Sequence, residues 1–145
     1  MPPLDDDRSA TGGSELAGLD APRPGQGLAV LAESLYLANL LLLPGIAFVI
    51  LLLVYWRAAP GAPPLAACHL RQTLSATLWA GMVLVIVNGL IIVFGGYTAA
   101  HIWVIVILYF TIGHSTFILL GILGLARAMA GQKFIYPVVG RACPE

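Results

Sequence analysis

The sequence predicts an all-α integral membrane protein, a helical bundle with three transmembrane helices. Hydrophobic residues make up 59% of the 145 residues and charged residues only 10%, whereas about half of a typical soluble domain is apolar. Three uncharged apolar runs are each long enough to cross roughly 30 Å of hydrocarbon, which requires about 20 helical residues. The formal net charge is zero, so the charge balance does not favour nucleic acid as a partner.

A separate tail precedes the predicted membrane domain. Residues 1–27 are rich in Pro, Gly, Ser and Asp, a composition typical of disordered segments because it offers little apolar surface for burial. The tail lacks the basic start and short apolar core of a cleaved signal peptide. We therefore expect a disordered acidic tail over 1–27 and one membrane domain over 28–126.

The first span is predicted over residues 35–56. It could begin as early as Leu28, which would make it overlong and therefore tilted, kinked or partly interfacial. Pro44 and Gly45 lie at its centre, and we expect a kink there because proline removes a backbone hydrogen bond and clashes with the preceding turn. Two separate spans are excluded because each half would be too short to cross the bilayer.

The second and third spans are predicted over residues 74–95 and 101–126, joined by the uncharged loop GGYTAA. Basic residues occur instead in the loop before the second span and in the interfacial segment 127–145: Arg57, Arg71, Arg127, Lys133 and Arg141. By the positive-inside rule these two segments are cytoplasmic, and an odd number of spans places the N-terminus outside. The expected location is the bacterial inner membrane, which the chain crosses several times.

Residues at the ends of the spans are expected to anchor the bundle at the two bilayer surfaces. Trp56 and Tyr136 would mark the cytoplasmic interface, and Tyr97 and Trp103 the outer one. Gly131 supplies a helix stop, so that the segment KFIYPVV can lie along the headgroups. The basic anchors at the cytoplasmic interface are Arg57, Arg71 and Lys133.

Small and polar residues within the spans point to function most directly, because a polar group in a bilayer is costly without a partner. On the second span, Thr77, Gly81 and Asn88 share one helical face. A similar stripe on the third span comprises Thr111, His114, Gly121, Gly124 and Ala128.

We expect the two stripes to pack together, because their small residues allow the helix backbones to approach closely. Counted from the cytoplasmic ends at 1.5 Å per residue, Asn88 and His114 lie about 21 and 18 Å deep, so they could meet directly or through water. With Thr77 and Thr111, they would form either a contact that only holds the helices together or a path for a ligand or proton. Both alternatives stay open at this point.

Reactive side chains form no recognisable catalytic or metal-binding pattern in the sequence. Cys68 and Cys143 lack metal-ligand spacing and are expected to be free thiols on the cytoplasmic side. No nucleophile-base pair or phosphate-binding glycine loop is evident, which predicts a non-enzymatic protein without cofactor or metal. The three histidines lie at different depths, so haem would require His114 from two chains. Glu33 and His101 share the outer end and could form a weak exposed ion pair.

Two polar motifs flank the second and third spans: HLRQTLSATLWA opens the second, and ARAMAGQKFIYPVVGR follows the third. Arg71 of the first motif is expected to contact a lipid phosphate or a neighbouring protein. Together with the Pro-Gly pair of the first span, this order resembles the Tic-twenty-like family of small bacterial membrane proteins, over roughly residues 35–141. The matching positions are His69, Arg71, Gln72, Ala130, Gly131, Lys133, Tyr136 and Pro137.

The resemblance implies a partner-binding or translocation-associated helical unit, because the related chloroplast component belongs to a protein-import complex. The longer Pro-rich loop RAAPGAPPLAACHLR and His114 depart from the family pattern.

The sequence favours a non-enzymatic inner-membrane protein that acts through protein partners, as an accessory, assembly or translocation-associated subunit or as a homo-oligomer. Its partner surface would be the loop with Arg57 and Arg71 together with the C-terminal segment. The alternative is an oligomeric channel or transporter component in which the region of Asn88 and His114 lines a solvated path. A minor alternative is a haem-binding electron-transfer subunit that uses the intermolecular histidine pair.

Overall fold

The computed structural model describes residues 22–143, which are mostly helical and contain no strand. The main helices are α2 (Gln26–Leu41), α3 (Ile46–Ala58), α4 (Pro64–Gly81), α5 (Asn88–Gly95) and α6 (Ala100–Met129). A π-helical segment, η2 (Met82–Val87), joins α4 to α5 without a break, and a short 3-10 turn, η1 (Ala59–Gly61), follows α3. The predicted all-α class is confirmed. Of the expected tail, residues 1–21 lie outside the described part of the chain.

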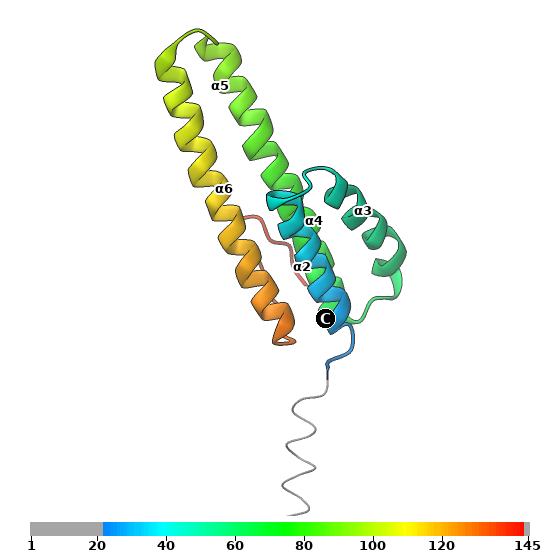
Figure 1. The fold of residues 1–145 in the computed structure, drawn as a ribbon. Coiled ribbons are helices and arrows are strands. Elements are labelled where there is room, and N and C mark those ends of the chain that lie inside the picture. The colour runs from blue at the N-terminus through cyan, green and yellow to red at the C-terminus, as the bar shows by residue number, and fades with distance from the viewer. Residues whose placement is uncertain (1–21, 144–145) are drawn as a thin grey trace, which may run out of the picture.

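The first apolar run folds into two antiparallel helices rather than one kinked span (Figure 1). One hydrophobic cluster joins the facing sides of the two helices, with Leu28, Ala32 and Leu35 from α2 and Leu51, Val54, Tyr55 and Ala58 from α3. The chain reverses between Leu41 and Ile46.

Gly45 and Asn39 make this reversal possible. Gly45 has a φ of 85°, a left-handed conformation that glycine adopts without the steric cost of a side chain. Its N–H donates to Asn39 Oδ1 at 2.9 Å, which satisfies a backbone donor in the turn. The prediction of a single kinked helix over 35–56 is therefore wrong. Each half is indeed too short to span a bilayer, but the halves pack side by side instead of continuing in one direction.

Two helical rods are long and apolar enough to cross a membrane. They run over Pro64–Gly95 and Ala100–Met129, which are 32 and 30 residues long, and only 17% of the most apolar window of each is buried. A core helix of a soluble protein would be largely covered, whereas these helices expose their apolar side chains. The structure thus offers two candidate spans in place of the expected three.

Asn88 closes the π-helical segment in the first of these rods. Its backbone N–H bonds to the Val85 carbonyl, three residues earlier, instead of the Leu84 carbonyl that a regular α-helix would use. The Asn88 side-chain amide donates to the Leu84 carbonyl at 2.7 Å. The side chain therefore satisfies the acceptor that the change in helix type would leave free.

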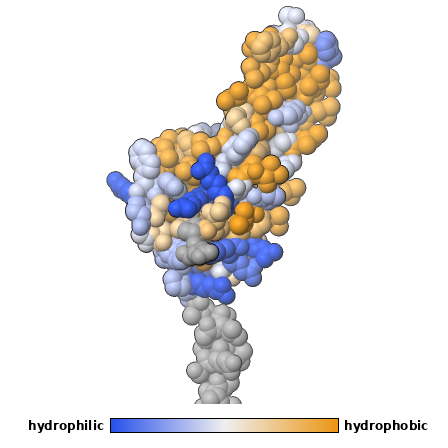
Figure 2. Space-filling model, turned by 180° about the vertical axis from the view of Figure 1, so that it is seen from behind, coloured by the Kyte–Doolittle hydropathy of each residue, from blue (hydrophilic) through white to orange (hydrophobic). Residues whose placement is uncertain are grey.

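The molecule has an apolar end and a polar end. Figure 2 shows hydrophobic residues covering the part built by α5 and the adjoining half of α6, while hydrophilic residues gather at the other end. At this polar end, Arg23 Nη1 donates to the Gly131 carbonyl at 2.9 Å, and Gln26 Nε2 donates to the Met129 carbonyl at 2.6 Å. Both ends of the described chain therefore lie at the same end of the molecule, whereas the predicted three-span orientation places them on opposite sides of a membrane.

Candidate functional site

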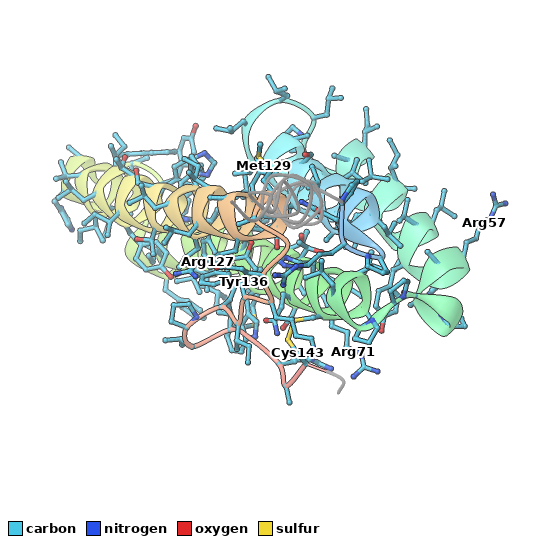
Figure 3. The ribbon with its side chains drawn as sticks, turned by 90° about the horizontal axis from the view of Figure 1, so that it is seen from below. Arg57, Arg71, Arg127, Met129, Tyr136 and Cys143 are labelled. Carbon is cyan, nitrogen blue, oxygen red and sulfur yellow. A yellow bond between two sulfur atoms is a disulfide. The ribbon has the colours of Figure 1, made fainter. Side chains whose placement is uncertain are left out.

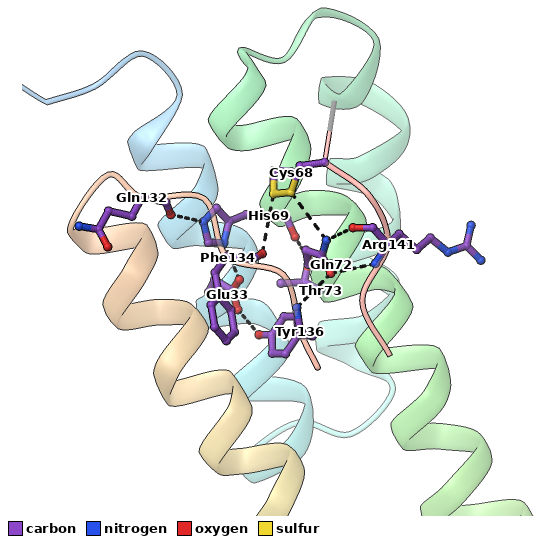
Figure 4. The surroundings of a disulfide bond; sticks show 10 residues. Glu33, Cys68, His69, Gln72, Thr73, Gln132, Phe134, Tyr136 and Arg141 are labelled. Atoms are coloured by element: carbon purple, nitrogen blue, oxygen red, sulfur yellow. Dashed lines mark hydrogen bonds and ion pairs between the residues drawn. A yellow bond between two sulfur atoms is a disulfide. The ribbon is translucent and has the colours of Figure 1, made fainter. Parts of the chain in front are cut away.

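A buried polar cluster lies at the polar end, where α2, α4 and the segment after α6 meet (Figure 4). It consists of Glu33 of α2, His69 and Gln72 of α4, and Tyr136 of the C-terminal segment. The first three side chains are fully buried and Tyr136 is only 1% exposed. Because charged and polar groups are rarely buried so completely unless they are paired, the hydrogen bonds of this cluster decide whether it is stable.

Glu33 and His69 share one proton. His69 Nδ1 lies 2.6 Å from Glu33 Oε1, and His69 Nε2 lies 3.0 Å from the Gln132 carbonyl oxygen. A carbonyl oxygen only accepts, so Nε2 carries a hydrogen, and one further proton lies between Nδ1 and Oε1. The pair is therefore either an imidazolium with a carboxylate or a neutral imidazole with a carboxylic acid. Both states have zero net charge, which makes deep burial tolerable.

Tyr136 completes the coordination of the Glu33 carboxyl group. Its hydroxyl donates to Glu33 Oε2 at 2.5 Å. Burial raises the pKa of the Tyr136 phenol above its ordinary value, and the nearby Glu33 carboxylate raises it further, so the phenol keeps its proton. Tyr36 packs edge-on against the Tyr136 ring, with 5.9 Å between centroids, and donates to the Phe117 carbonyl at 3.1 Å. The two tyrosines thereby connect α2 and the C-terminal segment to α6.

Gln72 holds the irregular backbone of the C-terminal segment inside the bundle. Its Oε1 accepts from the Arg141 N–H at 3.1 Å and from the Tyr136 N–H at 3.4 Å, and its Nε2 donates to the Arg141 carbonyl. Ser75 Oγ donates to the Val139 carbonyl at 2.8 Å. A side-chain amide supplies both a donor and acceptors, so it can satisfy backbone groups that belong to no helix. The segment therefore packs against α4 instead of lying along the headgroups, and Tyr136 is a core residue rather than an interface anchor.

Cys68 and Cys143 form a disulfide in this structure, with 4.7 Å between their Cα atoms. Cys68 lies in α4, one residue before His69, and Cys143 lies at the end of the described chain. The bond joins the C-terminal segment to the same helix face as Gln72. The expectation of two free thiols is wrong for this structure, because the fold of the C-terminal segment returns Cys143 to α4.

Small residues of α6 make room for the polar cluster. A Cβ atom on Gly124 would lie 2.5 Å from Tyr136 Oη and 2.6 Å from Glu33 Oε2, and one on Gly121 would lie 2.7 Å from Tyr36 Cε1. Ala128 is fully buried with Ala29 of α2. This stripe therefore packs against α2 and the C-terminal segment, not against the stripe of the second span as expected.

Asn88 and His114 do not meet. Leu84 lies opposite Gly113 and Gly95 opposite Ile102, a register that places Asn88 level with residue 109. Five residues separate that level from His114, which is about 7 Å along the helix axis. Thr77 donates to the Thr73 carbonyl at 2.7 Å within its own helix, and Thr111 is exposed. The four expected polar residues thus form no common cluster.

Two buried atoms among these residues have no hydrogen-bond partner in the described chain: Asn88 Oδ1 and His114 Nδ1. His114 stacks on Phe110, with 5.1 Å between ring centroids and 13° between planes. Its ring borders a cavity of about 300 Å³. An adjoining cavity of about 460 Å³ shares part of this lining.

We call this pair of cavities the tip crevice, because it lies between the tip of the α2–α3 hairpin and the two long helical rods. Both cavities are lined by Asn39, Pro44, Gly81 and Val85. A Cβ atom on Gly81 would meet nothing within 4 Å. The small face of the second span therefore borders open space rather than another helix.

The basic residues gather at the polar end. Residues 22–143 contain one acidic residue, Glu33, and six basic residues: Arg23, Arg57, Arg71, Arg127, Lys133 and Arg141. Figure 3, seen from that end, shows Arg57 and Arg71 pointing outward. The expected anchors Trp56, Arg57, Arg71 and Lys133 are all exposed. Because Glu33 is buried beside His69, it is not available to neutralise these cations.

His101 lies at the apolar end, so it does not pair with Glu33 as expected. At the same end, Trp103 Nε1 donates to the Tyr97 carbonyl at 2.8 Å, and the two rings pack edge-on. Both nitrogens of His69 are engaged within the protein, so His69 is not free to bind haem in this state. Among residues 22–143, no group of three or more His, Cys, Asp or Glu side chains could hold a metal ion.

Sequence reasoning did not predict the polar cluster as a unit. The sequence indicates His69 and Gln72 only as positions of a family resemblance, Tyr136 as one of these positions and as an interface anchor, and Glu33 at the outer end beside His101. One signal was present: Glu33 is the single acidic residue between residues 21 and 144, and it stands in an apolar run. No protein family, curated protein or solved structure matches this chain.

Proposed function

We propose that this chain is an integral inner-membrane protein that acts without catalysis, as an accessory or assembly subunit, by binding a transmembrane helix of a protein partner in the tip crevice. The exposed apolar surfaces of the two long rods support insertion into a bilayer. The polar cluster supports a structural role for the most polar residues, because their hydrogen bonds are made within the chain. The order of the HLRQT and Tyr-Pro motifs adds the resemblance to the Tic-twenty-like family.

The tip crevice is the observation that carries this proposal. A Cβ atom added to Gly81 would meet nothing within 4 Å among the described residues, and close contact between membrane helices depends on small residues of this kind. Phe48 and Thr77 extend the wall of the larger cavity, and His114 borders the smaller one. A partner helix with a hydroxyl or amide could donate to His114 Nδ1, or accept from it in the other tautomer, where residues 22–143 offer no partner.

The charge distribution supports a cytoplasmic polar end, because the six basic residues of the described chain gather there. The Cys68–Cys143 disulfide favours the opposite side, since disulfides persist in oxidising compartments. The proposal places the polar end in the cytoplasm, because six basic residues support this side and a single disulfide supports the other.

Gly81→Leu tests the proposed helix-binding role. The leucine side chain would occupy the tip crevice, and the fold should persist because no atom from elsewhere in residues 22–143 lies within 4 Å of the new Cβ. Gly89→Leu is the matched control, because Gly89 is also an exposed helical glycine without a neighbour within 4 Å. We expect the wild type and Gly89→Leu to elute from a mild detergent with the same stoichiometric partner protein, and Gly81→Leu to lose it.

The mass of the purified complex measures this outcome, and its composition shows whether the partner is another protein or a second copy of the chain. Equal retention of the partner by both leucine variants would refute helix binding in the tip crevice. A monodisperse single chain without any partner would also refute it.

A membrane path is the second candidate, favoured by the unpaired His114 Nδ1 beside the smaller cavity. Two long rods cannot enclose a pore in one molecule, so this function would require an oligomer. Reconstituted vesicles should then conduct an ion or proton flux that His114→Phe abolishes while the partner remains bound. Absence of flux in the wild-type oligomer would eliminate this candidate.

A further inference from the structure

We propose that a pocket formed by Arg71 and Arg141 binds the phosphodiester of an anionic phospholipid. The proposal rests on the membrane location given above but not on the binding of a partner helix. The pocket is a cavity of about 260 Å³ where α3, α4 and the C-terminal segment meet. Its lining consists of Tyr55, Arg71, Leu74, Ser75, Leu78 and Arg141.

Two arginines from separate segments line this pocket, and neither forms an ion pair with an acidic side chain among residues 22–143. Arg71 belongs to α4, whereas Arg141 is brought to it by the C-terminal segment, whose backbone is held by Gln72 at 3.1 Å. The one acidic residue among residues 22–143, Glu33, is buried elsewhere. Placing like charges together is unfavourable unless an anion lies between them, and paired guanidinium groups match the oxygens of a phosphate.

The hydroxyl groups of the pocket differ in their availability. Ser75 donates its hydroxyl hydrogen to the Val139 carbonyl, so only its oxygen lone pairs remain for other contacts. The Tyr55 hydroxyl makes no hydrogen bond among the described residues, which leaves it as a further donor toward a phosphate oxygen.

The surface next to the pocket fits an acyl chain. Leu74, Leu78 and Met82 follow one another at four-residue intervals along α4 and η2, which places them on one helical face. Leu78 lines the pocket formed by Arg71 and Arg141. Together with Met82, it also lines the larger cavity of the tip crevice. A cationic pocket that continues into an apolar groove matches a phospholipid, whereas a soluble anion would need only the cationic part.

Lipid binding by full-length protein in a mild detergent tests this inference. Native mass spectrometry would compare phosphatidylglycerol, phosphatidylcholine with the same acyl chains, and inorganic phosphate. We expect phosphatidylglycerol to bind at least tenfold more tightly than the other two. Arg71→Gln with Arg141→Gln should weaken phosphatidylglycerol binding about thirtyfold, since each basic residue near an anionic headgroup contributes roughly fivefold.

Arg57→Gln with Arg127→Gln is the matched control, because both arginines lie at the same end but outside the pocket. It removes the same charge and should change the affinity less than twofold. Equal losses in the two double variants would overturn the proposal in favour of a general charge effect. If the first double variant does not fold, Arg71→Gln alone, at an exposed position, should weaken binding about fivefold.

Two further outcomes would also overturn the proposal. Inorganic phosphate that binds as tightly as the lipid would assign the pocket to a soluble anion. A tenfold gain in lipid affinity after Asp5→Asn, Asp6→Asn and Asp7→Asn would assign it to the acidic tail of the chain. Loss of lipid binding with the partner still bound would leave the helix-binding role intact, so the two proposals fail separately.

Discussion

Glu33 can be buried because both of its carboxylate oxygens have donors, His69 on one side and Tyr136 on the other. Glu33→Ala would leave His69 Nδ1 without a partner and would remove the acceptor of the Tyr136 hydroxyl. Breaking a buried charged pair on one side costs about 3–5 kcal/mol, so this variant should unfold far more readily than the wild type. Thermal unfolding in detergent measures the effect.

Tyr136→Phe serves as the control for Glu33→Ala. It removes one donor to the carboxylate but keeps the ring in the core, so the expected loss is about 1–2 kcal/mol. If Glu33→Ala were no less stable than Tyr136→Phe, the proton-sharing pair would not contribute as described.

Gly124 and Gly81 offer a matched comparison of packing at the residue scale. Gly124→Ala would place a methyl group 2.5 Å from Tyr136 Oη and 2.6 Å from Glu33 Oε2, which forces the cluster apart. Overpacking of this kind costs about 1–3 kcal/mol. Gly81→Ala meets open space and should stabilise the helix by about 0.5–1 kcal/mol. Unfolding midpoints that shift in the same direction for both variants would contradict the placement of these glycines.

At the scale of elements, composition and apolar run length predicted the helical class and the two long rods. The second and third predicted spans, 74–95 and 101–126, lie within the rods Pro64–Gly95 and Ala100–Met129. The first span was mispredicted because hydropathy gives the length of an apolar segment but not whether the chain changes direction within it. The reversal depends on the left-handed φ of Gly45 and on the hydrogen bond from its N–H to the Asn39 side chain. A Pro-Gly pair in the sequence indicates a bend in the chain but not a full reversal.

The π-helical segment accounts for the buried Asn88 side chain better than the predicted contact with His114 does. Asn88→Ala would leave the Leu84 carbonyl without the side-chain donor that now satisfies it at 2.7 Å. An unpaired backbone acceptor in an apolar setting costs about 1–3 kcal/mol.

Thr116→Ala is the control for Asn88→Ala, because its hydroxyl bonds the Ile112 carbonyl at an exposed site within a regular helix. We expect a loss of at most about 0.5 kcal/mol there. Chemical unfolding of both variants in detergent would distinguish them, and equal losses would contradict the capping role of Asn88.

At the scale of the whole molecule, the sequence predicted which of the anchor side chains are exposed, but it did not predict which residues contact one another. The expected anchors Trp56, Arg57, Arg71 and Lys133 are exposed, since charge and aromatic position are local properties. The polar cluster joins Glu33, His69 and Tyr136 across 103 residues of chain. Such contacts depend on the α2–α3 hairpin and on the packing of the C-terminal segment against α4. Neither feature produces a repeating pattern of apolar residues that could be recognised in a single sequence.

Because of the α2–α3 hairpin, two rods rather than three helices are long and apolar enough to cross a bilayer, and residue 23 lies beside residue 131. The most direct test is to fuse topology reporters to the N-terminus and, separately, to the C-terminus of the full-length protein in a bacterial inner membrane. One reporter should be fluorescent only in the cytoplasm, and the other enzymatically active only outside. Both ends should report the cytoplasm. Ends on opposite sides of the membrane would restore the single kinked span and contradict the hairpin.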